Sequence, residues 1–352
     1  MNPLIPAPDV LPVAWGWFQG LLMLTFPLHL LLMNAVLGFS AVSLYARLKE
    51  DEIHVRLAHE LARALPILIA FTINFGVAPL LFLQVLFGNL FYTSSVLMAV
   101  YWLSVPFILI AAYYAVYFYD FKFTAIGKNG VVPIALAMGI FLTIPFIFTN
   151  NMTLMLEPQQ WSAYFSNRGG TMLNTGSSVV WPRYLHFVSS GMAVGGLFVA
   201  FFGRSKGKND PLLGELAVTI GMNLFTILTL LQIIIGSWFL INLPRPVKLL
   251  FMGGSLYTTA LFTVGFMLTF LAIWAGFKRR VLLCATVTVP LVYIMVFMRD
   301  AVRTGYLKPF FTPSMLNVVP QYSSLILFAL TLIIGIGTIA WMLRKTAKVY
   351  WG

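Results

Sequence analysis

Nine apolar stretches, each long enough to cross a lipid bilayer as a helix, constrain this chain more than any other feature of its sequence. A membrane-spanning helix needs about 20 predominantly apolar residues. The chain shows no internal repeat and no linker long enough to separate domains, so we expect one all-α, polytopic bundle over residues 1–352. The predicted spans are Trp15–Leu44, Ala64–Phe91, Val96–Tyr119, Val131–Phe148, Tyr184–Phe202, Leu216–Leu240, Leu250–Phe277, Val281–Met298 and Ser324–Leu343.

The composition excludes the soluble classes of protein. The chain is 60% hydrophobic and 9% charged, whereas a soluble domain is about 25% charged. A soluble fold of this size could not hide that much apolar surface. We therefore expect contact with membrane lipid, and we exclude a soluble enzyme, a nucleic-acid-binding domain and a disordered chain. Cys284 is the single cysteine and no C-x-x-C-H motif occurs, so we expect neither a disulfide nor covalently attached haem c.

The basic residues predict how the chain is oriented in the membrane. An odd number of spans puts the two termini on opposite faces, and cytoplasmic loops carry the excess of lysine and arginine. Of the 22 basic residues, 15 lie on the face opposite the N-terminus. We therefore expect the N-terminus outside, the C-terminus in the cytoplasm, and the cytoplasmic (inner) membrane of a bacterial-type cell as the location. The seven basic residues on the N-terminal face are Arg168, Arg183, Arg245, Lys248, Arg299, Arg303 and Lys308.

Two histidines, His29 and His186, stand out within the spans, which contain no aspartate, glutamate, lysine or arginine. Because a polar group in hydrocarbon is costly unless it is satisfied, an intramembrane histidine is a candidate functional residue. A neutral ring bonded to a neighbouring carbonyl is the structural alternative for either one. For two such histidines in so bare a bundle, metal or haem ligation is the better hypothesis. His186 is expected near the outer face and His29 about 20 Å along its helix.

Further candidate ligands collect at the outer face. Met252 begins the seventh predicted span, and a histidine and a methionine on facing helices can ligate one low-spin haem. Arg183, Arg299 and Arg303 are expected at the same level, where they could bind haem propionates through charge-assisted hydrogen bonds. Asp300 lies between the last two. Taken singly, Met252 could instead be a packing residue, and the arginines could be interface anchors paired with Asp300.

At this point the sequence resembles subunit I of the cytochrome bd quinol oxidases over nearly its whole length. The strongest matches are RYLHFVSSG at residues 183–191 and INFGVA at residues 73–78. The first is similar to the family segment that carries a haem b histidine, which implies that role for His186. The resemblance also implies a second histidine ligand at His29, an axial methionine at Met252, and a carboxylate followed by an arginine in DAVRTGY, at Asp300 and Arg303.

The sequence also differs from that family in ways that bear on its chemistry. The large quinol-binding outer loop is reduced to about residues 241–249, the third span lacks carboxylates, and Gln84 replaces a glutamate. These differences argue against haem d, against oxygen reduction and against a quinol site in that loop.

The hypothesis we prefer is an electron-transfer subunit that holds two or more haem b groups. It passes electrons between quinol, or a periplasmic cytochrome c, and a partner subunit. The partners we expect are a second membrane subunit, a periplasmic cytochrome c, or both. The alternatives are the catalytic subunit of a bd-type quinol:oxygen oxidase and a cofactor-free membrane transporter. No inverted repeat of the kind found in transporters is apparent.

Overall fold

The computed structural model describes residues 4–49 and 51–351 of the chain, with side chains described up to residue 347. The described chain is almost entirely helical, and its only strand-like pairing is a bridge between Leu11 and Val318. The elements are α1 (Trp15–Lys49), α2 (Glu52–Leu97), α3 (Ala99–Phe121), η1 (Gly127–Gly130), α4 (Val131–Leu156), η2 (Pro158–Phe165), α5 (Val180–Lys206), α6 (Pro211–Asn242), α7 (Arg245–Leu249), η3 (Leu250–Gly254), α8 (Leu256–Phe277), α9 (Val281–Leu307), η4 (Pro313–Met315) and α10 (Tyr322–Trp351).

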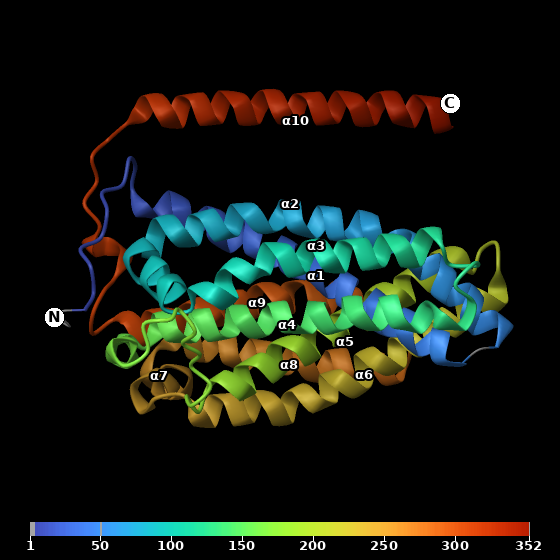
Figure 1. The fold of residues 1–352 in the computed structure, drawn as a ribbon, viewed down its shortest axis with the longest axis horizontal. Coiled ribbons are helices and arrows are strands. Elements are labelled where there is room, and N and C mark those ends of the chain that lie inside the picture. Colours follow the sequence, from blue (N-terminus) through green and yellow to red (C-terminus); the bar gives the residue numbers. More distant parts are fainter. Residues whose placement is uncertain (1–3, 50, 352) are drawn as a thin grey trace.

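The prediction of an all-α polytopic bundle is confirmed. Within the described chain, nine helices are long and apolar enough to cross a membrane, and they are α1 to α6 and α8 to α10. The long helices run roughly parallel or antiparallel to one another, and the two chain termini lie at opposite ends of the molecule (Figure 1). We refer to the end that holds the N-terminus, η2 and α7 as the outer end, following the orientation expected from the loop charges.

Pairs of glycines set the closest helix crossings. A Cβ atom on Gly38 of α1 would lie 2.2 Å from the backbone carbonyl carbon of Gly195 on α5. A Cβ on Gly196, the next residue of α5, would lie 2.7 Å from the carbonyl oxygen of Gly221 on α6. Small residues let helix backbones approach in lipid, where association depends on packing rather than on the hydrophobic effect. These crossings join α1, α5 and α6 into the centre of the bundle.

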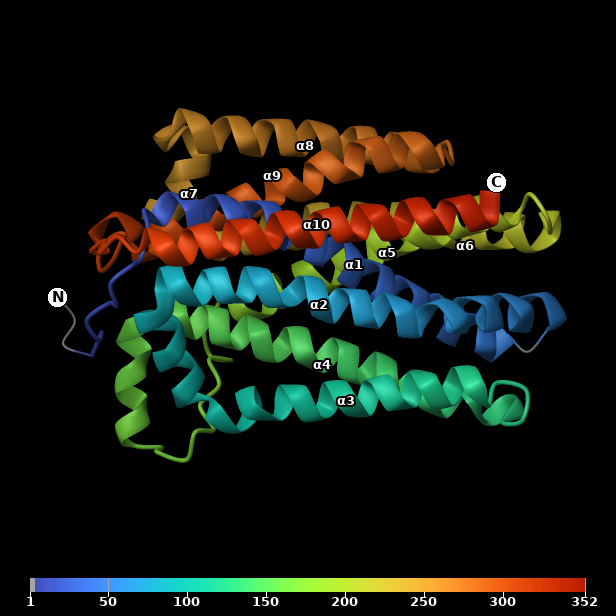
Figure 2. The same cartoon turned by 90° about the horizontal axis from the view of Figure 1, so that it is seen from above.

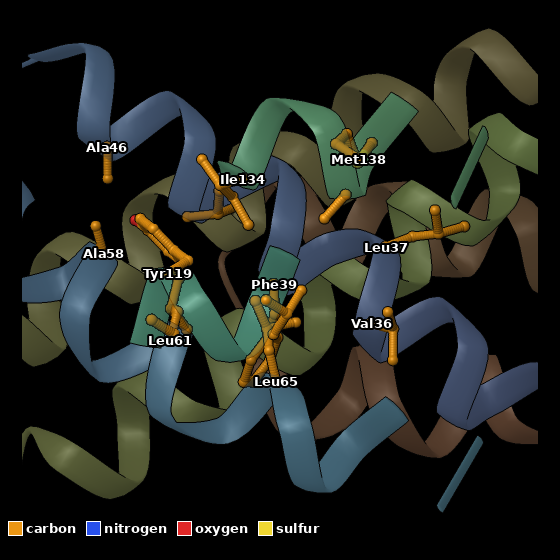
Figure 3. Close-up of a cluster of buried hydrophobic side chains, with 14 of the residues drawn as sticks. Val36, Leu37, Phe39, Ala46, Ala58, Leu61, Leu65, Tyr119, Ile134 and Met138 are labelled. Atoms are coloured by element: carbon orange, nitrogen blue, oxygen red, sulfur yellow. The ribbon is translucent and has the colours of Figure 1, made fainter. Parts of the chain in front are cut away.

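The largest buried cluster lies in the half of the bundle away from the N-terminus, among α1, α2, α3 and α4, with further residues from α5 and α6. Figure 3 shows Tyr119 of α3 among side chains of the neighbouring helices, including Leu61 and Ile134. The Tyr119 ring is fully buried, and its hydroxyl lies 3.0 Å from Ser43 Oγ of α1. This hydrogen bond satisfies the polar atom of an otherwise apolar cluster.

Several helices extend beyond the apolar spans predicted for them, and one begins later. The second helix begins at Glu52, and the predicted span from Ala64 is its apolar part, because a helix that extends beyond the lipid needs no apolar surface there. Asp51 caps this helix by accepting a hydrogen bond from the backbone N–H of His54. The His54 side chain also bonds to the Asp51 carboxylate and lowers the pKa of Asp51. The seventh span begins at Leu256 and not at Leu250, because the π-helical turn η3 comes before it.

The last helix, α10, stands apart from the others. An extended segment joins it to the bundle, and this segment is held by hydrogen bonds between Leu11 and residues 317 and 319. In the most apolar stretch of α10, no residue is buried against the rest of the protein. Figure 1 shows α10 running roughly parallel to the bundle axis and separated from the other helices by a gap.

Candidate functional site

A cavity lies in the outer half of the bundle, between α1, α2, α4, α5 and α9. It encloses about 180 Å³, and the empty space rises to about 1070 Å³ when its open mouth is included. Its walls are mainly apolar and include the aromatic rings of Phe26, Phe148 and Phe187. Ligand and cofactor sites are typically mostly apolar cavities with a few polar groups that fix orientation.

His29 of α1 lines this cavity, and its ring is fixed by the neighbouring helix. The Nδ1 atom lies 3.0 Å from the backbone carbonyl oxygen of Thr72 on α2. A carbonyl oxygen can only accept a hydrogen bond, so Nδ1 carries the proton and the lone pair of the neutral ring is on Nε2. Histidines that bind metals commonly donate their other ring N–H to a backbone carbonyl in this way, and the hydrogen bond sets the tautomer.

Gly76 of α2 makes this position for the ring possible. A Cβ atom at Gly76 would lie 2.7 Å from His29 Cε1 and 2.9 Å from His29 Nδ1. Those separations are well below a normal van der Waals contact. The residue one turn after Thr72 must therefore be glycine if the ring is to bond to the Thr72 carbonyl.

Three arginines and one aspartate line the same cavity as His29. Arg183 is in the first turns of α5, and Arg299, Asp300 and Arg303 are near the outer end of α9. Arg303 is ion-paired with Asp300. The guanidinium carbons of Arg299 and Arg303 each lie 4.4 Å from an aromatic ring centroid, over Phe26 and Phe87 respectively.

Two of these arginines lack a carboxylate partner. Within the described part of the chain, no carboxylate lies within ion-pairing distance of Arg183 or Arg299. Among the side chains that line the cavity, three guanidiniums and one carboxylate leave an excess of two positive charges, which the nearby buried Glu157 carboxylate partly offsets at Arg183. Because charge in an apolar surrounding is costly unless it is paired, this arrangement is suited to an occupant that carries two negative charges.

Several residues of the cavity escaped the sequence analysis. Three methionines, Met23, Met33 and Met152, also line it, so thioether sulfurs are present beside His29. Their sequence context does not indicate a binding role, because each lies in an apolar run where methionine commonly serves as a packing residue. Thr72 and Gly76 act through a backbone carbonyl and a missing side chain, which no residue-type pattern reveals.

Glu157, at the outer end of α4, was also missed. Its carboxylate is buried and accepts hydrogen bonds from Asn174 Nδ2 and Ser177 Oγ, both at 2.9 Å. These bonds join the end of α4 to the loop that leads into α5. That loop returns over the outer end of the bundle, and Met172 donates its N–H to the carbonyl of Leu97 at 3.2 Å. Glu157 therefore holds the segment that delivers Arg183 to the cavity.

His186 lies on another side of α5 and does not line the cavity. A Cβ atom on Gly236 of α6 would lie 3.3 Å from His186 Cε1, and the ring stacks on Phe239 with centroids 6.4 Å apart. Its Nδ1 atom is buried and makes no hydrogen bond of normal geometry in the described chain. The Gln232 side chain lies beside the ring, and its amide donates to the His186 carbonyl oxygen at 3.0 Å. A buried ring nitrogen without such a hydrogen bond is unusual, and it leaves this histidine able to bind a ligand.

Met252 lies in η3, outside the helix that it was expected to begin. The backbone there is non-helical, with φ −114° at Met252 and φ +95° at Gly253. Thr258 and Thr259 of α8 bond to the carbonyl oxygen of Leu250 and hold the turn in place. The Met252 side chain is 56% exposed. A sulfur on an irregular, exposed turn is accessible to an occupant on this side of the bundle, but it does not belong to the cavity.

The structure thus divides the seven predicted site residues. It brings five of them, His29, Arg183, Arg299, Asp300 and Arg303, to one cavity. His186 and Met252 are outside it. The arginines, which were expected at the level of His186, share the cavity with His29, and Arg183 lies about one turn before His186 on α5.

No protein-family model matches the chain, and no curated protein matches its sequence. Within the described residues, no cluster of three or more histidine, cysteine, aspartate or glutamate side chains could hold a metal ion. A haem site differs from such clusters because the iron needs only one or two protein ligands.

Proposed function

We propose that this chain is a haem b-binding, electron-transferring subunit of a membrane oxidoreductase. The proposal rests on the cavity inside the membrane bundle, which is lined by a neutral histidine and by two arginines without carboxylate partners. Haem b matches both features, because its iron binds an imidazole nitrogen and its two propionates bind two guanidiniums. We also propose that the chain is related to cytochrome bd subunit I, which its sequence resembles, and that it is located in a bacterial-type inner membrane.

Each residue of the cavity has a separate task in this proposal. His29 would bind iron through Nε2, while the Thr72 carbonyl holds the ring and makes it more basic. Arg183 and Arg299 would bind the propionates. Asp300 neutralises Arg303, so that the cavity charge matches two carboxylates rather than three. The rings of Phe26, Phe148 and Phe187 exclude water from the space between these groups.

A haem bound here would supply reversible one-electron transfer. The outer position of the cavity favours an electron partner at the outer side of the membrane, which we propose to be quinol or a periplasmic cytochrome c, with a further subunit as the other partner. His186, whose buried Nδ1 makes no hydrogen bond of normal geometry, is proposed to hold a second haem. The pairing of His186 with Met252 rests on the resemblance and remains a prediction.

The test is the haem content and spectrum of the purified full-length protein, measured by pyridine haemochrome and by reduced-minus-oxidised difference spectra. We expect haem b, and we expect His29→Ala to lower the haem-to-protein ratio or change the spin state. His54→Ala is the matched control, because His54 lies at the cytoplasmic start of α2, far along the chain from the cavity residues.

The outcomes separate the alternatives. A colourless protein, or a His29→Ala variant with the same haem content and spectrum as the parent, would refute the assignment of the cavity. A colourless protein would leave the transporter hypothesis ahead. Haem b together with rapid quinol-dependent oxygen uptake would favour the bd-type oxidase over the electron-transfer subunit.

A further inference from the structure

The side chains of α10 that the structure describes are almost all exposed. Its large apolar side chains are exposed all round; for example, Leu327 is 65% exposed and Ile334 67%. Cβ atoms built on Gly335 and Gly337 would meet no other atom within 4 Å. Elsewhere in this bundle, helix-interior glycines such as Gly195 mark the closest helix crossings. Exposed apolar surface alone is no argument for a partner in a membrane, because lipid covers it as well as protein does.

A second observation, on α2, points to protein rather than lipid. The Asn74 side chain is exposed on the lateral face of the bundle, the face that contacts lipid in a membrane. It lies ten residues into the predicted span that begins at Ala64, about 15 Å at 1.5 Å per residue. That is near the middle of a hydrocarbon layer about 30 Å thick. The amide of a lipid-facing asparagine is therefore at the depth where water is least available.

The Asn74 amide is mostly unsatisfied. Within the described chain its one hydrogen bond is from Nδ2 to the carbonyl oxygen of Ala70, at 2.8 Å. The carbonyl oxygen Oδ1 and the second N–H of the amide are left without a partner. Lipid tails cannot bond to them, and an unsatisfied polar group in hydrocarbon is costly. A neighbouring transmembrane helix with a polar side chain at the same depth would satisfy them.

The apolar residues around Asn74 form a stripe along α2. The exposed positions Ile67, Phe71, Asn74 and Leu81 recur at helical spacing on one face. In Figures 1 and 2, α2 is at the side of the bundle along which α10 runs. Figure 1 shows a gap between α10 and the bundle, so the stripe of α2 and the side chains of α10 are both left exposed, and we call them together the α2–α10 surface.

We propose that a second copy of this chain packs on the α2–α10 surface, in a two-fold arrangement that brings the two Asn74 side chains together. A two-fold contact puts each residue near its own counterpart, so the residue at the axis must be complementary to itself. An amide meets that condition because it has both a donor and an acceptor.

One rival surface has the same kind of signal. Asn223 of α6 is also exposed, seven residues into the predicted span that begins at Leu216. It is about 10 Å deep at 1.5 Å per residue, and so closer to the membrane surface than Asn74. Figure 1 shows α6 on the side of the bundle away from α10. Asn223 therefore lacks an unattached helix beside it, and it provides a matched comparison.

The test uses single-cysteine variants of the full chain in native membranes. Cys284 is buried and is replaced by alanine, and Asn74→Cys or Asn223→Cys is then added. A disulfide requires Cβ atoms within about 4.5 Å of each other. We expect mild oxidation to convert Asn74→Cys to a covalent dimer and to leave Asn223→Cys monomeric. A copy-number measurement by photobleaching in nanodiscs should give two copies of the parent chain.

A third variant tests the amide itself. Asn74→Leu keeps the helix apolar and should weaken dimerisation in lipid by roughly threefold to thirtyfold, the range measured for hydrogen bonds between transmembrane helices. The proposal is overturned by a covalent dimer of Asn223→Cys in place of Asn74→Cys, or by a photobleaching count of one. It is also overturned if Asn74→Cys is captured by a different membrane polypeptide. None of these outcomes depends on haem, so a failure here leaves the proposed function untouched.

Discussion

Replacing Gly76 with alanine should displace His29 and weaken cofactor binding without removing any polar group. The new Cβ would lie 2.7 Å from His29 Cε1, whereas carbon atoms rarely approach closer than about 3.5 Å. The ring or the helix must then shift by about 0.8 Å, and the 3.0 Å hydrogen bond from Nδ1 to the Thr72 carbonyl is strained or lost. Loss of such a supporting bond costs about tenfold to a hundredfold in metal affinity.

Haem retention during purification, followed by haem titration of depleted protein, measures this effect. Gly139→Ala in α4 is the matched control, because a Cβ there meets no atom within 4 Å. Alanine is favoured over glycine in a helix by about 1 kcal/mol, so the control should bind haem as the parent does and be at least as stable. If Gly76→Ala and Gly139→Ala retain haem equally and with the same spectrum, the ring of His29 is not an iron ligand.

Three further predictions concern the charges, the packing and the second histidine. Arg299→Leu should lower the affinity for haem by about tenfold to a hundredfold, which is the contribution of a charge-assisted hydrogen bond. In the same titration, Arg245→Leu should leave the affinity unchanged, and equal effects of the two variants would contradict a propionate site. Gly38→Ala should reduce the free energy of unfolding by about 1–3 kcal/mol, because its Cβ meets α5 backbone, and an unchanged unfolding midpoint in detergent would contradict this crossing. His186→Ala and Met252→Ala should each turn a low-spin spectrum into a high-spin one or remove a haem, and an unchanged spectrum in both would refute that ligand pair.

The span pattern predicted the helices well because the bilayer imposes a length and a composition that can be counted along the chain. It failed where helices leave the membrane. The first turns of α2, from Glu52 onward, are helical although they are rich in charge. The end of α9 is another case, since this helix continues to Leu307, well past the predicted end at Met298. Apolarity reports the lipid layer, whereas helical backbone can extend beyond it.

That extension of α9 explains why the candidate site was only partly predicted. With a helix that ends at Met298, Arg299 and Arg303 would be loop residues at the outer face, at the level of His186. Because α9 continues, both arginines lie within a helix that borders the cavity. Arginine side chains are long and can reach along a helix toward a polar partner. Position along the chain therefore did not reveal that these arginines share a cavity with His29.

The charges in the cavity also distinguish a binding site from structural anchoring. An arginine that only anchors a helix at the membrane surface extends toward water and needs no ligand. Arg183 and Arg299 instead line a mainly apolar cavity that they share with a histidine from α1, and Asp300 is already engaged by Arg303. Since unpaired buried charge is destabilising, the bundle should gain stability when an anion enters. The ligand class that we propose, a doubly carboxylated metal macrocycle, would bind His29 and neutralise both guanidiniums at once, and so would make the two ends of the cavity parts of one site.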